Sequence, residues 1–211
     1  MGVWTCKCFV RRKARVFCYF TRAIKHRSDK TNSMVNNAGV ALEQYQTGGR
    51  KRMHEVEEKT FDGTIKVNSK GVFLGCKYAI AQMLKQDIIA ENGDRGWVIN
   101  MASVAGWIGI PTASSYIASK HACIGITRVA ALEYGPDHIH VNAICPGYIE
   151  TPMTETIRAR DDDHEAVVAQ HPWGRFGKPD EIAKTAVFLA SDDASFMTGV
   201  PMPVDGGYLA R

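Results

Sequence analysis

From Met34 onward, the hydrophobic and polar positions of the chain change period repeatedly. Short runs rich in β-forming residues alternate with longer stretches whose apolar residues follow a helical spacing. This alternation favours parallel strands that are joined by helical crossovers. The predicted strands cover residues 33–36, 97–100, 140–143 and 199–204, and the predicted helices cover residues 61–86, 115–134 and 179–190.

Unusual polar residues follow three of the predicted strands. Asn36 and Asn37 end the first strand, Ser103 follows the second, and residues 146–151 follow the third. In an open parallel sheet, ligands bind outside the carboxyl ends of the strands. We therefore expect an α/β protein with a ligand site at this edge of its sheet.

Tyr116 and Lys120 lie four residues apart within the predicted helix 115–134. Positions i and i+4 share one face of a helix, so the ammonium can lie beside the phenol. A tyrosine has a pKa of about 10, and a cation within about 4 to 6 Å lowers that pKa by about 1 to 3. Ser103, thirteen residues earlier, would hold and polarise a substrate oxygen. The three residues predict a site that moves a proton on and off an alcohol oxygen.

The composition is that of one globular domain without a membrane partner. The chain has 211 residues, of which 45% are hydrophobic and 23% are charged. No apolar run approaches the roughly 20 residues that span a membrane. The six cysteines are scattered and no secretory signal is visible. We expect reduced thiols, a cytoplasmic location, and core positions for Cys76, Cys123 and Cys145.

The net charge of +4 is distributed unevenly along the chain. Residues 1–30 hold nine Lys or Arg and one acid, whereas the rest holds 17 basic and 21 acidic residues. Such a break marks two segments of different character. We expect a basic leader of unassigned structure over residues 1–33 and a mildly acidic domain over residues 34–211, with no nucleic-acid partner.

Six short motifs stand in order along residues 34–211. They are Asn36-Asn37-Ala38-Gly39, Val67-Asn68-Ser69-Lys70-Gly71, Asn100-Met101-Ala102-Ser103, Tyr116 with Lys120, Pro146-Gly147-Tyr148-Ile149-Glu150-Thr151-Pro152, and Asp205-Gly206-Gly207. Together they resemble the motifs of the short-chain dehydrogenase/reductase family. The resemblance implies a Rossmann-like, doubly wound parallel sheet. It also implies NAD(P)-dependent interconversion of a small-molecule secondary alcohol and a ketone.

The resemblance implies a catalytic role for four residues. Tyr116 would be the acid or base, and Ser103 would position the substrate oxygen. Lys120 would lower the tyrosine pKa and bind the nicotinamide ribose. Asn68 would hold a water that connects Lys120 to solvent. The alternatives are that Ser103 is only a helix cap and that Asn68 only satisfies a helix kink near Gly71.

Further residues would contact the cofactor, for which NADP is the preferred guess. Asn37 would line the adenosine side, although it could equally be only a turn former. Ile149 and Thr151 would contact the nicotinamide carboxamide. The acidic run 161–163 looks like a solvated loop or helix start rather than a metal site, so no metal is expected.

Family members commonly pair through the helices that match residues 64–85 and 115–134, so we expect a homo-oligomer. A second hypothesis follows from the same surfaces. The chain could be a catalytically inactive family member that acts as an oligomer-forming interaction protein. Retention of all four catalytic residues argues mildly against this alternative.

The beginning of the chain departs from the family pattern. Family members usually place a Gly-rich turn and two further strand and helix units before the Asn-Asn-Ala-Gly turn. Here that turn starts at residue 36, and no glycine lies between Gly2 and Gly39. We expect an N-terminally truncated fold that lacks the first strand and helix units, with a leader foreign to the family. The first remaining strand would be an edge, and residues 16–20 are the only nearby run that could replace a strand.

Overall fold

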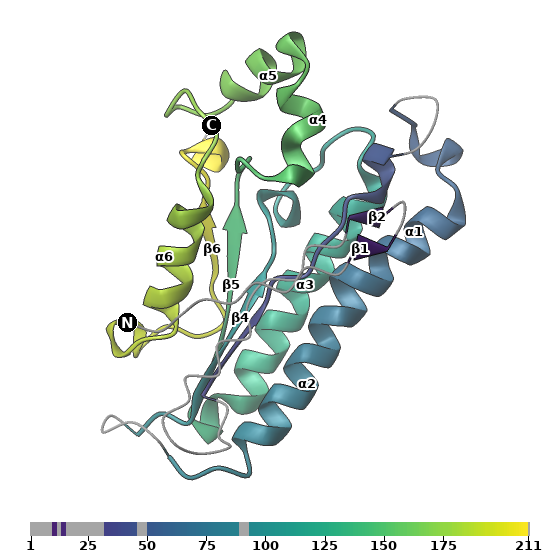
Figure 1. The fold of residues 1–211 in the computed structure, drawn as a ribbon. Coiled ribbons are helices and arrows are strands. Elements are labelled where there is room, and N and C mark those ends of the chain that lie inside the picture. Colours follow the sequence, from purple (N-terminus) through teal and green to yellow (C-terminus); the bar gives the residue numbers. More distant parts are fainter. Residues whose placement is uncertain (1–9, 12–13, 16–31, 46–49, 89–92, 211) are drawn as a thin grey trace.

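A computed structural model describes residues 10–11, 14–15, 32–45, 50–88 and 93–210. Within these residues, a parallel four-stranded sheet has the order β3-β4-β5-β6 (Figure 1). β3 is therefore the edge strand on one side of the described sheet. A separate antiparallel pair is formed by two short strands, and the run 16–20 lies outside the described residues. The strands are β1 (Val10–Arg11), β2 (Ala14–Arg15), β3 (Ser33–Asn36), β4 (Gly96–Met101), β5 (Ile139–Pro146) and β6 (Pro201–Val204).

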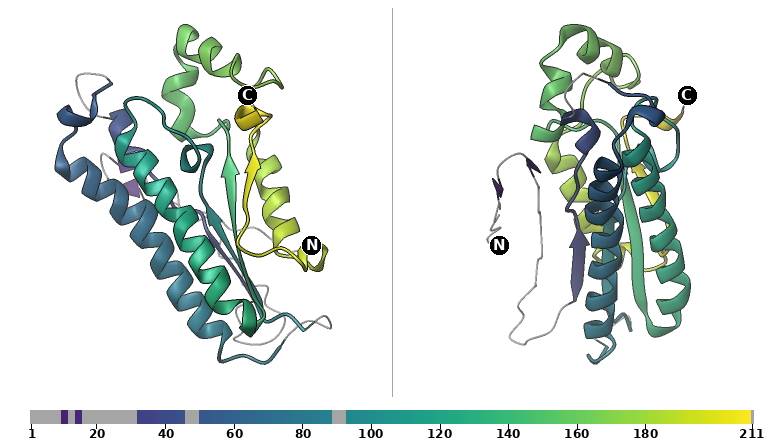
Figure 2. Two further views of the ribbon diagram at one scale, coloured as in Figure 1. Left: turned by 180° about the vertical axis from the view of Figure 1, so that it is seen from behind. Right: turned by 90° about the vertical axis from the view of Figure 1, so that its right-hand side faces the viewer.

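Helices cover both faces of the parallel sheet (Figures 1 and 2). α2 and α3 pack on one face, and α6 packs on the other. α4 and α5 lie beyond the carboxyl ends of the strands (Figure 1). The predicted α/β fold with a doubly wound parallel sheet is thus confirmed. The helices are α1 (Glu58–Ile65), α2 (Gly71–Met83), α3 (Ser114–Tyr134), α4 (Glu155–Arg158), α5 (Asp161–Val168) and α6 (Pro179–Leu189).

The central strands are buried on both faces because their side chains alternate between two cores. In β4, Val98 packs under α2 and α3, whereas its neighbour Ile99 packs under α6. In β5, Ala143 and Ile144 divide in the same way. Near-continuous apolar runs of this kind are typical of parallel strands.

The predicted elements are present, with shifted ends. The predicted helix 61–86 is α1 and α2, which are joined by a π-helical turn over Lys66–Lys70. The last strand starts at Pro201 rather than at residue 199, because Gly199 has a φ of 75°, outside the range of a strand. Among the described residues, no helix is both long enough and apolar enough to cross a membrane.

A chain of hydrogen-bonded polar side chains connects β3 and β4 to α3 in the core. Asn36 Nδ2 donates to Asn100 Oδ1 at 2.8 Å, and Asn100 Nδ2 donates to Thr127 Oγ1 at 2.9 Å. Asn100 and Thr127 are fully buried. Buried polar groups that are satisfied in this way rigidify a core, so the carboxyl end of β3 is held at a fixed place beside β4.

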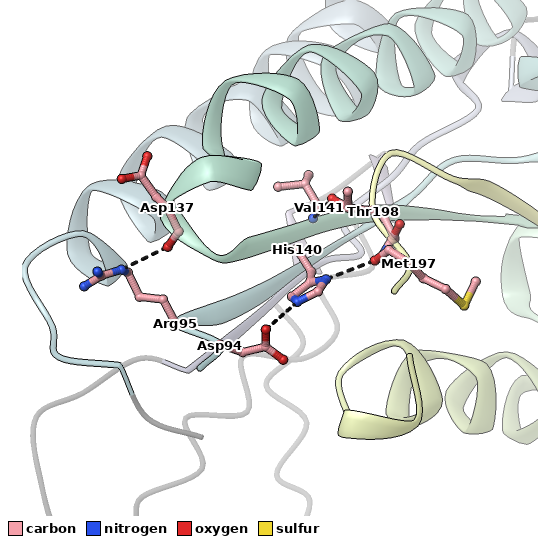
Figure 3. A network of polar contacts seen from close by, with 8 residues as sticks. Asp94, Arg95, Asp137, His140, Val141, Met197 and Thr198 are labelled. Carbon is pink, nitrogen blue, oxygen red and sulfur yellow. Dashed lines mark hydrogen bonds and ion pairs between the residues drawn. The ribbon is translucent and has the colours of Figure 1, made fainter. Parts of the chain in front are cut away.

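A second polar network lies at the opposite end of the sheet, where β4 and β5 begin (Figure 3). His140 Nε2 lies 2.8 Å from Asp94 Oδ1, and His140 Nδ1 lies 3.1 Å from the carbonyl oxygen of Met197. Both ring nitrogens therefore face oxygen atoms. Arg95 Nε donates to the carbonyl oxygen of Asp137 nearby, at 3.1 Å. These contacts fix the loops that enter the sheet.

Candidate active site

A cavity of about 1630 Å³ opens at the carboxyl ends of the parallel strands. It lies where the sequence predicts a ligand site, at the edge reached by the segments that follow β3, β4 and β5. The structure brings together six of the seven predicted site residues in its wall, namely Asn37, Ser103, Tyr116, Lys120, Ile149 and Thr151.

Tyr116 and Lys120 lie on the same side of the first turns of α3. Lys120 Nζ is 5.4 Å from the centroid of the Tyr116 ring, so the cation contacts the aromatic face. The Lys120 residue is only 4% exposed, and its ammonium donates to the carbonyl oxygen of Met101 at 2.8 Å. Tyr116 is half-buried. The ammonium is therefore fixed at the end of β4, beside the phenol.

Ser103 is buried just beyond the end of β4. Its Oγ accepts a hydrogen bond from the backbone amide of Ala105 at 3.1 Å, at the start of the turn Val104–Gly106. The oxygen of Ser103 therefore caps this turn, as the alternative of a helix cap predicts. The hydroxyl group still carries a proton that a cap of this kind does not use. Ser103 can thus cap the turn and donate into the cavity at once.

Gly106 allows the turn after Ser103 to pack directly against α3. A Cβ atom at this position would lie 2.9 Å from the carbonyl oxygen of Lys120 and 2.6 Å from Ile124 Cδ1. Real Cβ atoms essentially never come that close to such neighbours. The absence of a side chain at Gly106 therefore lets Ser103 and Lys120 share one wall.

Asn68 is fully buried in the π-helical turn and lies behind the cavity. Its Oδ1 accepts from Val40 N at 2.8 Å, and its Nδ2 donates to Val40 O at 2.8 Å and to Ser119 Oγ at 3.0 Å. The side chain thus connects the segment after β3 to α3. This agrees with the alternative of a polar residue that satisfies an irregular helix. A role in holding a water stays a prediction.

Asn68 nevertheless lies close to Lys120. A Cβ atom placed on Gly39 would be 3.7 Å from Asn68 Oδ1 and 3.7 Å from Lys120 Nζ. At these distances the Cβ atom would be in ordinary van der Waals contact with both side chains, so Asn68 and Lys120 both border Gly39.

The segment that carries Ile149 and Thr151 is held by backbone contacts. Gly177 N donates to Tyr148 O at 2.9 Å, and Glu150 N donates to Gly177 O at 2.9 Å. Thr154 Oγ1 donates to Ile149 O at 2.6 Å. The predicted cofactor contacts therefore lie on a loop with a defined conformation.

Tyr148 also lines the cavity, among aromatic side chains. Its ring centroid is 5.8 Å from that of His171 and 5.9 Å from those of Phe176 and Tyr208. Burial, with smaller contributions from Tyr208 and Tyr116, raises the pKa of Tyr148 to about 12. Its phenol therefore stays protonated at neutral pH.

Glu43 is a lining residue that the sequence analysis did not identify. Its carboxylate binds residues 114–116, which lie 71 to 73 positions away along the chain. A carboxylate in a short turn carries no local pattern that signals such a distant partner. Only the fold reveals the contact.

Comparisons with known proteins show a family model and relatives that are similar to this chain. A family model described as enoyl-(acyl carrier protein) reductase matches residues 2–209. The 2,5-dichloro-2,5-cyclohexadiene-1,4-diol dehydrogenase of Sphingobium indicum is 43% identical over 159 residues, which cover 74% of this chain and 60% of the relative. The cyclohexanol dehydrogenase of Acinetobacter sp. is 38% identical over 179 residues, which cover 83% of this chain and 63% of the relative.

A solved structure shares the fold. It is a protein of Agrobacterium tumefaciens described as a 2-deoxy-d-gluconate 3-dehydrogenase, with bound NADP. It matches with a TM-score of 0.76 and 36% sequence identity, over 85% of this chain and 68% of that chain. Of the two curated relatives named in the preceding paragraph, the chain spans only 60% and 63% of the full length.

Proposed function

Because the chain belongs to the short-chain dehydrogenase/reductase family, we propose that its site interconverts a secondary alcohol and a ketone with NAD(P). One observation carries the proposal. The Lys120 ammonium lies 5.4 Å from the ring centroid of Tyr116 in the wall of a cavity that Ser103 also lines. The relatives named for cyclohexanol and for a cyclohexadiene diol act on ring alcohols, which supports a substrate of that class.

In this proposal, Tyr116 transfers the proton. The phenol gives its proton to the carbonyl oxygen during ketone reduction, and the phenolate takes a proton from the hydroxyl during alcohol oxidation. Ser103 donates a hydrogen bond to the same oxygen and holds it near the phenol. Lys120 places its positive charge beside the Tyr116 ring. Asn68 holds the segment after β3 against α3, through its contacts with Val40 and Ser119.

Support for a nicotinamide site comes from the cavity wall, which Lys120, Ile149 and Thr151 all line. When bound, NAD(P) supplies or accepts the hydride. Lys120 would bind the nicotinamide ribose, and Ile149 with Thr151 would contact the carboxamide. Asn37 would line the adenosine side. In this sequence no glycine stands between Gly2 and Gly39, whereas a Gly-rich turn is what binds the pyrophosphate in dinucleotide-binding folds of this kind. The NADP in the related structure supports NADP as the first cofactor to test.

Thermal unfolding with added NADPH or NADH tests cofactor binding. A ligand at 100 times its dissociation constant stabilises the folded state by about 2.7 kcal/mol, so we expect a clear rise in the melting temperature. The variant Lys120→Met should lose much of that rise, whereas the exposed Lys77→Met should keep it. An unchanged melting temperature with both cofactors at millimolar concentration would contradict binding by this chain. Oxidation of cyclohexanol then tests turnover.

The exposed apolar side chains of α2 and α3 support assembly as a homo-oligomer. Phe73 and Tyr78 on α2 and Val129 and Leu132 on α3 are exposed to solvent. Large exposed apolar patches mark protein interaction sites, and α2 and α3, which pack against each other, both contribute exposed apolar side chains. We therefore propose pairing through helices 64–85 and 115–134. The same pairing is required by the alternative that the chain is an inactive, oligomer-forming family member. Tyr116→Phe should leave this assembly unchanged in either case.

A further inference from the structure

Glu43 connects the segment after β3 to the first turn of α3. The residue is 9% exposed. Its Oε1 accepts hydrogen bonds from the amide of Ser115 at 2.7 Å and from Ser114 Oγ at 3.1 Å. Its Oε2 accepts from the amide of Tyr116 at 3.1 Å. One buried carboxylate thus binds three donors at the start of the helix that carries Tyr116 and Lys120.

These amides are the ones that a helix cap normally satisfies. α3 begins at Ser114, so Ser115 and Tyr116 occupy its second and third positions. A local cap places a Ser, Thr, Asp or Asn oxygen on these two amides. The residue before α3 is Ala113, which has no such oxygen, and its backbone (φ −128°, ψ 34°) is not the extended conformation of a usual cap residue. Glu43 therefore supplies the missing cap from a distant segment, and its charge suits the positive end of the helix.

Segment 40–43 is itself fixed at several points. The backbone N–H and carbonyl of Val40 each form a hydrogen bond with the side-chain amide of Asn68, which also donates to Ser119 Oγ on α3. Leu42 packs so closely on α1 that a Cβ atom on Gly63 would lie 2.8 Å from Leu42 Cδ1. The carboxylate of Glu43 is therefore presented by a rigid segment and not by a freely moving one.

The backbone of Tyr116 is held on both sides. Glu43 binds its amide, and Ser119 Oγ donates to its carbonyl oxygen at 2.7 Å. The direction in which a side chain leaves a helix depends on its backbone position. A shift in the first turn of α3 would therefore move the phenol relative to Ser103, which lies on a different element. Displacements of about 1 Å at a reacting group are enough to slow a reaction by about a hundredfold.

We propose that Glu43 is a positioning residue for Tyr116, which it aims at the substrate oxygen through the N-terminus of α3. The inference rests on the proposed function, because it assigns a purpose to the orientation of the Tyr116 phenol. Glu43 acts through the helix backbone and does not itself transfer a proton. The expected consequence is a change in turnover rather than in substrate binding.

The test compares Glu43→Ala and Glu43→Gln with Glu133→Ala, an exposed glutamate at the other end of the same helix. Hydrogen exchange of the Ser115 and Tyr116 amides reports the cap. The ¹⁹F resonance of 3-fluorotyrosine at position 116 reports the phenol. Neither measurement needs cofactor or substrate. Steady-state kinetics with cyclohexanol report kcat and KM separately.

In Glu43→Ala we expect the two amides to exchange about fivefold faster or more, since a lost cap has roughly that effect on a helix end. The Thr127 amide should keep its rate, and the Tyr116 resonance should shift or broaden. Glu43→Gln retains one accepting oxygen, so it should restore part of the protection. Where the chain turns over, kcat should fall while KM stays within about twofold. Glu133→Ala should change none of these.

Two results would overturn the inference. One is an unchanged Tyr116 resonance and unchanged amide exchange in Glu43→Ala. The other is uniformly faster exchange along α3 with the same loss in Glu43→Gln, which indicates general destabilisation. A wild-type chain without turnover would contradict the proposed function alone, because the exchange and ¹⁹F measurements still decide the role of Glu43.

Discussion

Lys120 shows how one side chain at this site is held in place. An ammonium that is removed from water needs acceptors, because an unpaired buried charge is costly. Met101 provides a carbonyl oxygen at 2.8 Å, and the face of the Tyr116 ring lies 5.4 Å from the nitrogen. The same contacts that satisfy Lys120 therefore also hold its charge next to the phenol.

The buried thiols should be unreactive in the folded protein. Cys76, Cys123 and Cys145 are buried, as predicted from their apolar neighbours. Burial raises the pKa of Cys123 and of Cys145 to about 11. At pH 8 only about one part in a thousand of such a thiol is the reactive thiolate.

A variant with Ser at positions 6, 8 and 18 isolates these three thiols. A chromogenic disulfide reagent at pH 8 should give almost no signal until denaturant is added, and then three equivalents. Rapid reaction without denaturant would contradict the packing of the core.

The ion pair of Arg175 and Glu181 should make the stability of the folded protein depend on pH in the acid range. The two guanidinium nitrogens lie 2.9 and 2.7 Å from the carboxylate oxygens. The hydrogen bonds from Arg175, with that from the Lys178 amide, lower the pKa of Glu181 from 4.5 to about 2. A lowered folded-state pKa stabilises the fold above pH 4.5 and loses that effect as the pH falls towards 2.

Melting temperatures of the wild type and of Glu181→Gln should therefore differ most above pH 4.5, with the wild type higher, and should converge near pH 2. Since both side chains are only partly buried, salt should reduce the difference. A difference that grows as the pH falls would contradict this assignment.

At the scale of elements, Asn68 should contribute strongly to stability. Its side chain makes three buried hydrogen bonds between the π-helical turn, Val40 and Ser119. Asn68→Ala leaves the backbone groups of Val40 without this partner, so we expect a loss of about 2 to 3 kcal/mol in the free energy of unfolding. Urea unfolding monitored by circular dichroism measures it.

Ser69→Ala is the matched control in the same turn. Ser69 Oγ makes one longer hydrogen bond to Ser119 O, at 3.3 Å. Its removal should cost about 1 kcal/mol or less. Equal losses in the two variants would contradict the role assigned to the Asn68 contacts.

The sequence predicted elements whose physical signal is local. Two helices have their main features within a few neighbouring residues. One is the helix that starts at Pro179, and the other is the helix that carries Tyr116 and Lys120. Ser103 lines the cavity because it follows a buried strand. The roles of these residues in catalysis remain predictions.

Other features depend on distant partners, and the sequence pattern does not contain them. The π-helical turn at Lys66–Lys70 interrupts a helix whose apolar spacing continues through it. Glu43 and the N-terminus of α3 meet only because β3 and β4 pair in the sheet and carry their following segments to one edge. The hydrogen bond from the Asn68 side chain to the carbonyl oxygen of Val40 likewise forms only in the folded chain.

At the scale of the whole molecule, the outer faces of α2 and α3 should carry the oligomer contact. Leu132 on α3 is 81% exposed. A charge introduced there would be buried on assembly, so Leu132→Asp should convert the oligomer to monomer. Sedimentation velocity at several concentrations measures the change.

Met53→Asp is the control for this experiment, because Met53 is 76% exposed but lies in a turn before α1. It should leave the oligomer intact. A monomeric wild type, or an oligomer that Leu132→Asp does not affect, would contradict pairing through these helices.

The most direct test of the site is the rate of cyclohexanol oxidation with NADP⁺ or NAD⁺. Tyr116→Phe should lower kcat by about 10² to 10⁴, the usual contribution of a general acid or base. Tyr134→Phe makes the same change at the far end of α3 and should leave kcat unaltered. Equal rates for the wild type and Tyr116→Phe, or the absence of turnover by the wild type, would contradict the proposed chemistry.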